Sequence, residues 1–115
     1  TWILPRVIVH SRAAELFYTG DVIDAATALD WGLVSRVVAP EALMGEAQAI
    51  AGKIVAMPPA ALRATKVLLR QGRSVTYDTA LELAATTQAH MHHTEDHAEG
   101  VAALIGKRAP VFTGR

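Results

Sequence analysis

The spacing of apolar and polar residues along the chain predicts a mainly α-helical protein. Apolar or small residues recur every three or four positions in six segments, which is the period of one face of an α-helix. The predicted helices are residues 11–18, 24–31, 41–57, 59–72, 76–91 and 94–105. Only residues 33–39 favour a short β-strand, because they are rich in β-branched side chains.

Residues with known cap preferences mark the predicted helix ends. Gly20 and Gly32 follow the first two helices, where a left-handed residue commonly closes a helix. The predicted N-caps are Asp24, Thr94 and either Ser74 or Thr76. Residues 58–59, both proline, end one helix and begin the next, and residues 109–115 are predicted to be irregular. Each helix should turn its apolar side inward, including Ala14, Phe17 and Tyr18 in the first and Leu43, Ala47, Ile50, Ala51 and Ile54 in the third.

Composition supports the helical prediction and excludes several classes of protein. Apolar residues make up 51% of the chain but aromatic residues only 5%, and alanine, the best helix former, is the commonest residue. Lys+Arg and Asp+Glu balance at 11 each, so no net basic charge indicates a nucleic acid or an anionic membrane as partner. The absence of cysteine excludes disulfides and thiolate chemistry. No apolar run approaches the roughly 20 residues that span a bilayer.

The start of the chain is unusual for a natural amino terminus. It opens on the large apolar residues of Trp2-Ile3-Leu4-Pro5-Arg6, whereas amino termini are more often polar and loosely held. We therefore expect that the chain begins inside a longer protein. An isolated strand at residues 33–39 would likewise need partners from a missing segment.

The densest cluster of chemically active side chains is residues 90–97, His-Met-His-His-Thr-Glu-Asp-His. Histidines three or four positions apart on one helix can share a metal ion, and His93 and His97 have that spacing. However, Thr94 is predicted to interrupt the helix, and it stands where a His-Glu-x-x-His zinc motif has glutamate. Histidines near a helix C-terminus are also favoured by the helix dipole alone. We therefore predict no metal site and keep a metal protein as the alternative.

A basic stripe recurs at helical spacing on the fourth predicted helix: Arg63, Lys66, Arg70 and Arg73. Such a stripe could bind an anion, for example phosphate. A solvated face opposite the leucines is the simpler interpretation, and we favour it. The acidic residues are explained as caps, first-turn charges or surface groups, and no nucleophile motif or phosphate loop occurs. Composition and spacing thus indicate a helical protein without an evident active site.

Several segments together resemble the enoyl-CoA hydratase/isomerase (crotonase) family. Three segments are similar to the middle of the family's sequences. They are Arg12-Ala13-Ala14-Glu15-Leu16, Thr19-Gly20-Asp21-x-Ile23-Asp24-Ala25 and Ala28-x-x-x-Gly32-Leu33-Val34, with Val37-Val38 after them. The family's Pro-x-Ala…Lys helix matches Pro58-Pro59-Ala60 and Lys66. Its ending, Thr-x-Asp-x-x-Glu-Gly…Lys-Arg-x-Pro-x-Phe, matches residues 94–100 and 107–112. The resemblance is specific because the segments follow the family's order over nearly the whole chain.

The resemblance implies the carboxy-terminal part of the spiral crotonase fold (the ClpP/crotonase-like fold). Residues 1–39 would end the spiral core, and residues 40–115 would form the helical region through which family members build trimers and hexamers. The N-terminal catalytic core is expected to be absent. In the family, backbone amides form an oxyanion hole for the thioester carbonyl, and one or two carboxylates move protons. These groups precede the stretch matching Leu4-Pro5-Arg6, so no catalytic residue is expected here, and all should lie upstream of Thr1.

Part of the coenzyme A (CoA) site is expected to remain. In family members the last helices of one subunit reach the CoA pocket of a neighbour, where a lysine can meet a phosphate, and Lys107 occupies the matching position. A surface lysine favoured by the helix dipole explains Lys107 equally well. Gln88 and Leu104 stand where related hydratases place aromatic residues along this pocket, and Val9 replaces a usual glycine. The pocket is therefore expected to depart from the family's shape.

The resemblance implies a cytoplasmic enoyl-CoA hydratase of fatty acid metabolism. It would add water reversibly to trans-2-enoyl-CoA thioesters, with the CoA thioester as substrate and no further cofactor. The close alternative is a double-bond isomerase, including a ring isomerase of the phenylacetate pathway. The chain also resembles such a ring isomerase at its start, Ile3-Leu4-Pro5-Arg6, and at its ending. Two upstream glutamates would favour hydration, and a single acid would favour isomerisation. A helical assembly module without activity is the third hypothesis.

Overall fold

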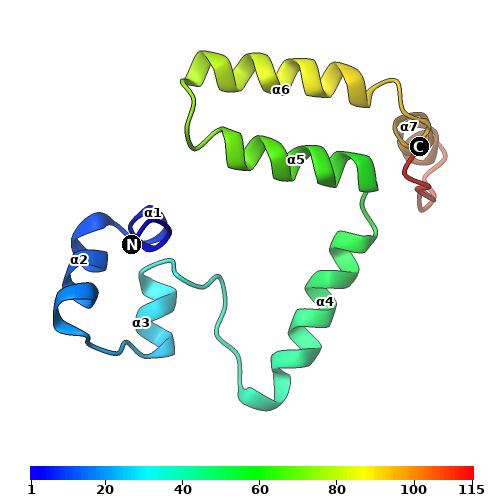
Figure 1. Ribbon diagram of the computed structural model, residues 1–115. Helices are drawn as coiled ribbons and strands as arrows, with labels where there is room; N and C mark the ends of the chain where they lie inside the picture. Colours follow the sequence, from blue (N-terminus) through cyan, green and yellow to red (C-terminus); the bar gives the residue numbers. More distant parts are fainter. The chain divides into compact units, whose positions relative to one another are not determined.

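The computed structural model describes residues 1–115 and contains seven α-helices, a short 3₁₀ turn at Pro40–Ala42 and no β-strand (Figure 1). The prediction of a mainly helical chain is therefore confirmed. The helices are α1 (Leu4–Val7), α2 (His10–Thr19), α3 (Ala25–Asp30), α4 (Leu43–Val55), α5 (Pro59–Gln71), α6 (Tyr77–Met91) and α7 (Glu95–Ile105). Their contacts divide the chain into two compact units, Thr1–Glu46 and Ala47–Arg115.

The first unit has a small apolar core made by α1, α2 and α3. Its buried apolar side chains are Ile8, Ala13 and Ala28. The predicted ends of α2 and α3 are confirmed, since Gly20 and Gly32 have φ values of 71° and 74°. α1 was not predicted from the sequence, although proline in its first turn is a known start signal.

The strand predicted at residues 33–39 is wrong. The N–H groups of Leu33 and Val34 both donate to the carbonyl oxygen of Ala28, at 2.9 and 3.3 Å, and thus close the end of α3. A strand is stable only when a neighbouring strand takes up its N–H and C=O groups, and this chain has no other strand. The β-branched residues of this segment therefore favour a strand locally, but the chain has no second strand with which it could pair.

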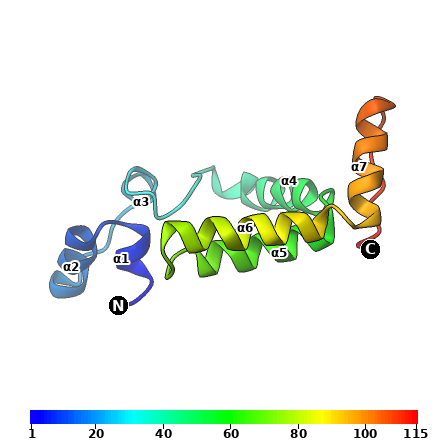
Figure 2. The ribbon, with the colours of Figure 1, turned by 90° about the horizontal axis from the view of Figure 1, so that it is seen from above.

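The second unit consists of most of α4 followed by α5, α6 and α7. α5 and α6 lie side by side and antiparallel, and α7 runs crosswise at one end of the pair (Figures 1 and 2). Two predicted N-caps are confirmed: the hydroxyl oxygens of Thr76 and Thr94 accept from the N–H groups of Thr79 and His97, at 3.3 and 3.1 Å. No helix combines the length and the apolar character needed to cross a membrane.

The predicted apolar helix faces form but are not covered by the rest of the chain. α4 contains no buried residue, and Leu43 and Ile54 remain 59% and 50% exposed. Tyr18, predicted to face inward on α2, is 88% exposed. The prediction that these residues pack inward was therefore wrong. The periodicity identifies the apolar face of a helix, but it does not identify the element that packs against that face. Burying one such side chain stabilises by about 1.5–3 kcal/mol, so these faces are strong candidates for further packing.

Candidate functional site

The end of α7 holds Lys107 in an uncommon backbone conformation. Its φ of 50° makes it the one non-glycine residue with a positive φ. Its N–H donates to the carbonyl of Leu104 at 3.2 Å, and the N–H of Arg108 donates to the carbonyl of Ala103 at 3.0 Å. These two bonds form a Schellman motif, whose left-handed position is usually glycine. A lysine there costs roughly 1 kcal/mol, and backbone strain of this kind is concentrated at functional sites.

Asp96 on α7 binds the end of the chain. Its side chain is buried, at 2% exposure, and its two carboxylate oxygens accept from the N–H groups of Thr113 and Gly114 at 2.6 and 2.9 Å. The N–H of Asp96 in turn donates to the carbonyl of Arg115 at 3.2 Å. The C-terminal tail, residues 109–115, is irregular as predicted, yet it is bound to the start of α7.

Glu99, one turn further along α7, binds the beginning of the same tail. Its oxygens accept from both terminal nitrogens of Arg108 at 2.5 and 2.7 Å and from the N–H of Val111 at 2.8 Å. The Phe112 ring lies against Gly100. The residues that resemble the family's ending thus serve a structural purpose, which is to cap α7 and fix its tail.

Strongly acidic solution should release the Glu99 contacts. Arg108, and then the Val111 N–H, lower the pKa of Glu99 from 4.5 to about 2. A depressed carboxyl pKa stabilises the folded state above its ordinary value of 4.5, and this contribution is lost as the pH falls towards 2. The amide NMR shift of Val111 should therefore titrate in that window.

Two variants check this titration. Glu99→Gln should abolish the transition at Val111, and Glu82→Gln on α6 should leave it unchanged. A Val111 shift that stays constant through the acidic window in the unaltered chain would contradict the assigned contact.

The structure separates Gln88 from the other two predicted CoA contacts. Leu104 and Lys107 share the end of α7, where Leu104 is 80% exposed. Gln88 instead lines a hollow of about 380 Å³ between α5 and α6, and half of the residues that line it are alanine or threonine. Neither Leu104 nor Lys107 lines that hollow.

The helix break predicted within the histidine cluster is confirmed, because α6 ends at Met91 and α7 begins at Glu95. The break nevertheless brings the rings of His92 and His97 together, with centroids 4.5 Å apart, at the edge of the same hollow. The structure contains no group of three or more His, Cys, Asp or Glu side chains placed to hold a metal ion.

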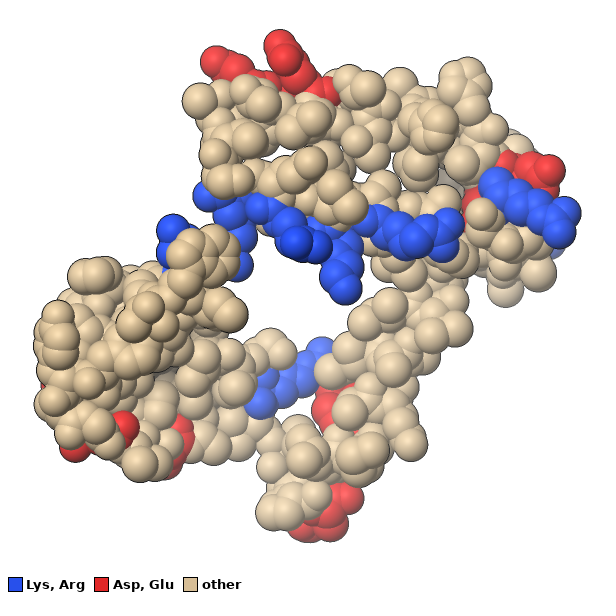
Figure 3. All heavy atoms as spheres, viewed as in Figure 1, with Lys and Arg blue, Asp and Glu red and all other residues tan.

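Basic side chains gather along one side of α5 and just beyond its end, where Arg63, Lys66, Arg70 and Arg73 are all exposed (Figure 3). At 100° per residue, the three of them on α5, Arg63, Lys66 and Arg70, lie opposite the alanine, threonine and Leu68 side chains that α5 contributes to its hollow with α6. The stripe therefore forms the outer face of this helix pair, as predicted.

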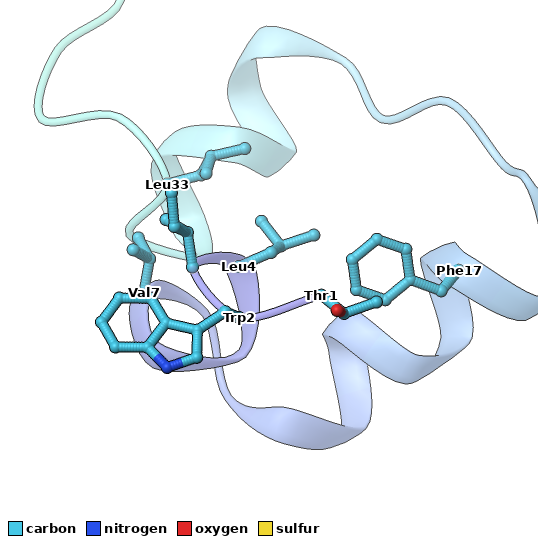
Figure 4. Close-up of a pocket in the computed structure, with 7 residues that line it drawn as sticks. Thr1, Trp2, Leu4, Val7, Phe17 and Leu33 are labelled. Carbon is cyan, nitrogen blue, oxygen red and sulfur yellow. The ribbon is translucent and has the colours of Figure 1, made fainter.

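An apolar hollow in the first unit was not predicted from the sequence. Residues before α1, α1 itself, α2 and the segment after α3 surround about 510 Å³, lined by Thr1, Trp2, Ile3, Leu4, Val7, Phe17 and Leu33. Figure 4 shows the Trp2 and Phe17 rings on either side of Leu4 in this view. The guanidinium carbon of Arg6 lies 4.2 Å from the Trp2 ring centroid. Four separate segments form this hollow, so no local pattern could have indicated it.

Comparisons with known proteins agree with the resemblance. The family model described as enoyl-CoA hydratase/isomerase matches residues 1–115. The chain is 36% identical to the 1,2-epoxyphenylacetyl-CoA isomerase of Escherichia coli (strain K12), covering 100% of this chain and 44% of that protein. It is also 36% identical to the crotonyl-CoA hydratase of Syntrophomonas wolfei, covering 97% of this chain and 43% of that protein.

A solved structure shows the same fold. The enoyl-CoA hydratase of Bacillus anthracis superposes with a TM-score of 0.94 at 38% identity, over 97% of this chain and 43% of that one. The chain therefore belongs to the enoyl-CoA hydratase/isomerase family and corresponds to the carboxy-terminal part of its fold. It spans less than half the length of these curated relatives.

Proposed function

We propose that the protein is an enoyl-CoA hydratase that adds water reversibly to trans-2-enoyl-CoA thioesters. The match of the family model to every residue of the chain is the observation that carries this proposal, and the likeness to a crotonyl-CoA hydratase supports hydration. In this reaction, backbone amides stabilise the enolate oxygen while carboxylates deliver water and a proton. The protein works in the cytoplasm, in fatty acid metabolism, and needs no cofactor beyond the CoA of its substrate.

The catalytic carboxylates belong to a segment that precedes Thr1. A general base must have an oxygen available to the proton that it abstracts. The oxygens of Asp96 and Glu99 are already bound to the tail, and Asp24 accepts from the Thr27 N–H at 2.8 Å as the N-cap of α3. These three acids therefore have structural roles.

Lys107 contacts a CoA phosphate, in the pocket of a neighbouring subunit, with Leu104 beside it. The support is its strained left-handed backbone, a conformation that glycine adopts at lower cost and that is concentrated at functional sites. Lysine suits the task because its ammonium group is a flexible point charge with three donors. Gln88 is kept as a separate candidate CoA contact, in the hollow between α5 and α6.

Replacing Lys107 should separate CoA binding from stability. Lys107→Gly removes the charge and relieves the backbone strain, so the unfolding free energy should rise by roughly 1 kcal/mol. The dissociation constant of CoA, measured by isothermal titration calorimetry, should nevertheless increase about tenfold, because one charge-assisted hydrogen bond to phosphate is lost. Lys53→Gln, at an exposed lysine of α4, is the matched control. Unchanged CoA affinity in Lys107→Gly would remove this residue from the site.

The active form is a homo-oligomer, a trimer or a hexamer. The exposed apolar face of α4, with Leu43, Met44 and Ile54, supports association. The balanced charge of the chain supports neither a nucleic acid nor a membrane as a partner.

Isomerisation is the second candidate reaction, and the likeness to 1,2-epoxyphenylacetyl-CoA isomerase favours it. An aromatic acyl-CoA thioester would then be the substrate. Mass spectrometry of the products distinguishes the two reactions in a polypeptide that includes the residues before Thr1. Hydration adds one water to an enoyl-CoA, whereas isomerisation leaves its mass unchanged.

A further inference from the structure

The junction between α6 and α7 brings two histidine rings into contact. His92 is the C-cap of α6 and His97 lies in the first turn of α7, and their ring centroids are 4.5 Å apart with planes tilted by 31°. Thr94 joins the same two helices, because its hydroxyl donates to the carbonyl oxygen of Met91 at 2.7 Å and accepts from the N–H of His97 at 3.1 Å. The ring contact and the cap bond that begins α7 therefore share one residue, His97.

The hollows beside the two rings contribute no further charge. α5 lines the hollow of about 380 Å³ next to both rings with alanine, threonine and leucine side chains, and α6 adds alanine, threonine, Gln88 and Met91. A smaller hollow of about 90 Å³, also lined by His97, contains no other acidic or basic residue. The two imidazoles are therefore the only titratable groups among the residues that line either hollow.

The titratable groups on the same two helices face other directions. His90 and Glu95 each stand two positions from one of the rings, which corresponds to about 200° around the helix. Both carboxylate oxygens of Asp96 accept from the tail, and the carbonyl oxygen of Arg115 accepts from the Asp96 N–H. His93, in the break between the helices, makes no ring contact. Protonation therefore acts most directly on the contact between the two rings.

We propose that the contact between His92 and His97 is an acid-sensitive switch at the start of α7. Imidazole gains its charge between pH 8 and pH 5, so both rings are neutral above this range and carry like charges below it. Two unit charges 4.5 Å apart in water repel each other enough to shift an equilibrium roughly fivefold, and the value for water applies because both side chains are exposed. Acid therefore separates the rings and loosens the first turn of α7. This inference is independent of the proposed function, because it concerns a contact within the chain.

NMR spectroscopy measures this contact directly. The nuclear Overhauser effect between the His92 and His97 rings should be present at pH 8 and absent at pH 5. The protection factor of the His97 amide, which is corrected for the intrinsic pH dependence of hydrogen exchange, should fall roughly fivefold over the same range. This change precedes the protonation of Glu99, whose pKa is about 2, so the two acid transitions are separate.

Two variants remove one charge and keep an aromatic ring at the junction. His92→Phe and His97→Phe should each give the same protection of the amide at position 97 at pH 8 and pH 5, because no pair of like charges forms. His93→Phe is the matched control, since it replaces a histidine outside the contact, and it should keep the roughly fivefold response. Circular dichroism shows whether each variant keeps its helices.

Three results would overturn the inference. The first is a ring-to-ring Overhauser effect that persists at pH 5 with an unchanged protection factor. The second is a response that survives in both His92→Phe and His97→Phe, because another titratable group would then cause it. The third is a response that disappears in His93→Phe, which would assign the acid sensitivity to His93.

Discussion

Replacing Asp96 with alanine should detach the C-terminal tail from α7. The substitution leaves the N–H groups of Thr113 and Gly114 without their buried acceptors. A hydrogen bond to a charged group contributes about 1.5–3 kcal/mol, so the loss of both should cost about 3 kcal/mol or more. Hydrogen exchange at the two amides should therefore accelerate on the order of 100-fold.

Two further variants show whether this effect belongs to the carboxylate. Asp96→Asn keeps one acceptor oxygen and should give an intermediate exchange rate. Glu95→Gln changes the exposed neighbouring acid, which has no bond to the tail, and should leave exchange at Thr113 and Gly114 unaltered. Exchange in Asp96→Ala that stays at the rate of the unaltered chain would show that other contacts hold the tail.

The tail also connects stability with the proposed CoA contact. Arg108 directly follows Lys107 and is bound by Glu99. The ion pair between Glu99 and Arg108 therefore fixes both the start of the tail and the left-handed turn at Lys107. Glu99→Gln should accordingly weaken CoA binding indirectly, together with faster exchange at the start of the tail. Lys107→Gly should weaken it with the tail unchanged, and this difference distinguishes a positioning effect from a direct contact.

Helices were predictable from the sequence because their signals are local. The N-caps Asp24, Thr76 and Thr94 lie within three residues of the N–H groups that they accept from, and Gly20 closes α2 by its own backbone freedom. Each of these features depends on one turn of chain. The family resemblance was readable for a similar reason, since its ending is made of caps and tail contacts at fixed spacing.

Features that depend on distant segments were not predictable. Asp96 was interpreted as a first-turn charge, yet the returning tail buries it, and its partners are 17 and 18 residues away. Residues 33–39 have the composition of a strand, but pairing requires a second strand. The hollow between Trp2 and Phe17 exists only after α1 and α2 pack together. Lys107 is proposed as a CoA contact from its position in the sequence, and only the structure showed its left-handed backbone.

The 115-residue chain should not hydrate crotonyl-CoA. Enzymes exceed the uncatalysed rate by at least about 10⁶-fold, and this requires an oxyanion hole and an acid or base at the reacting carbons. Within the second unit, the carboxylates of Asp96 and Glu99 bind the tail and are not free for proton transfer. Loss of the absorbance of the crotonyl double bond should therefore proceed at the rate of the buffer, in a preparation that binds CoA through Lys107. Hydration above that rate would place catalytic groups within residues 1–115 and contradict a catalytic segment before Thr1. Hydration at the buffer rate combined with no CoA binding would favour a helical assembly module, because both halves of the proposed function would then be missing from the chain.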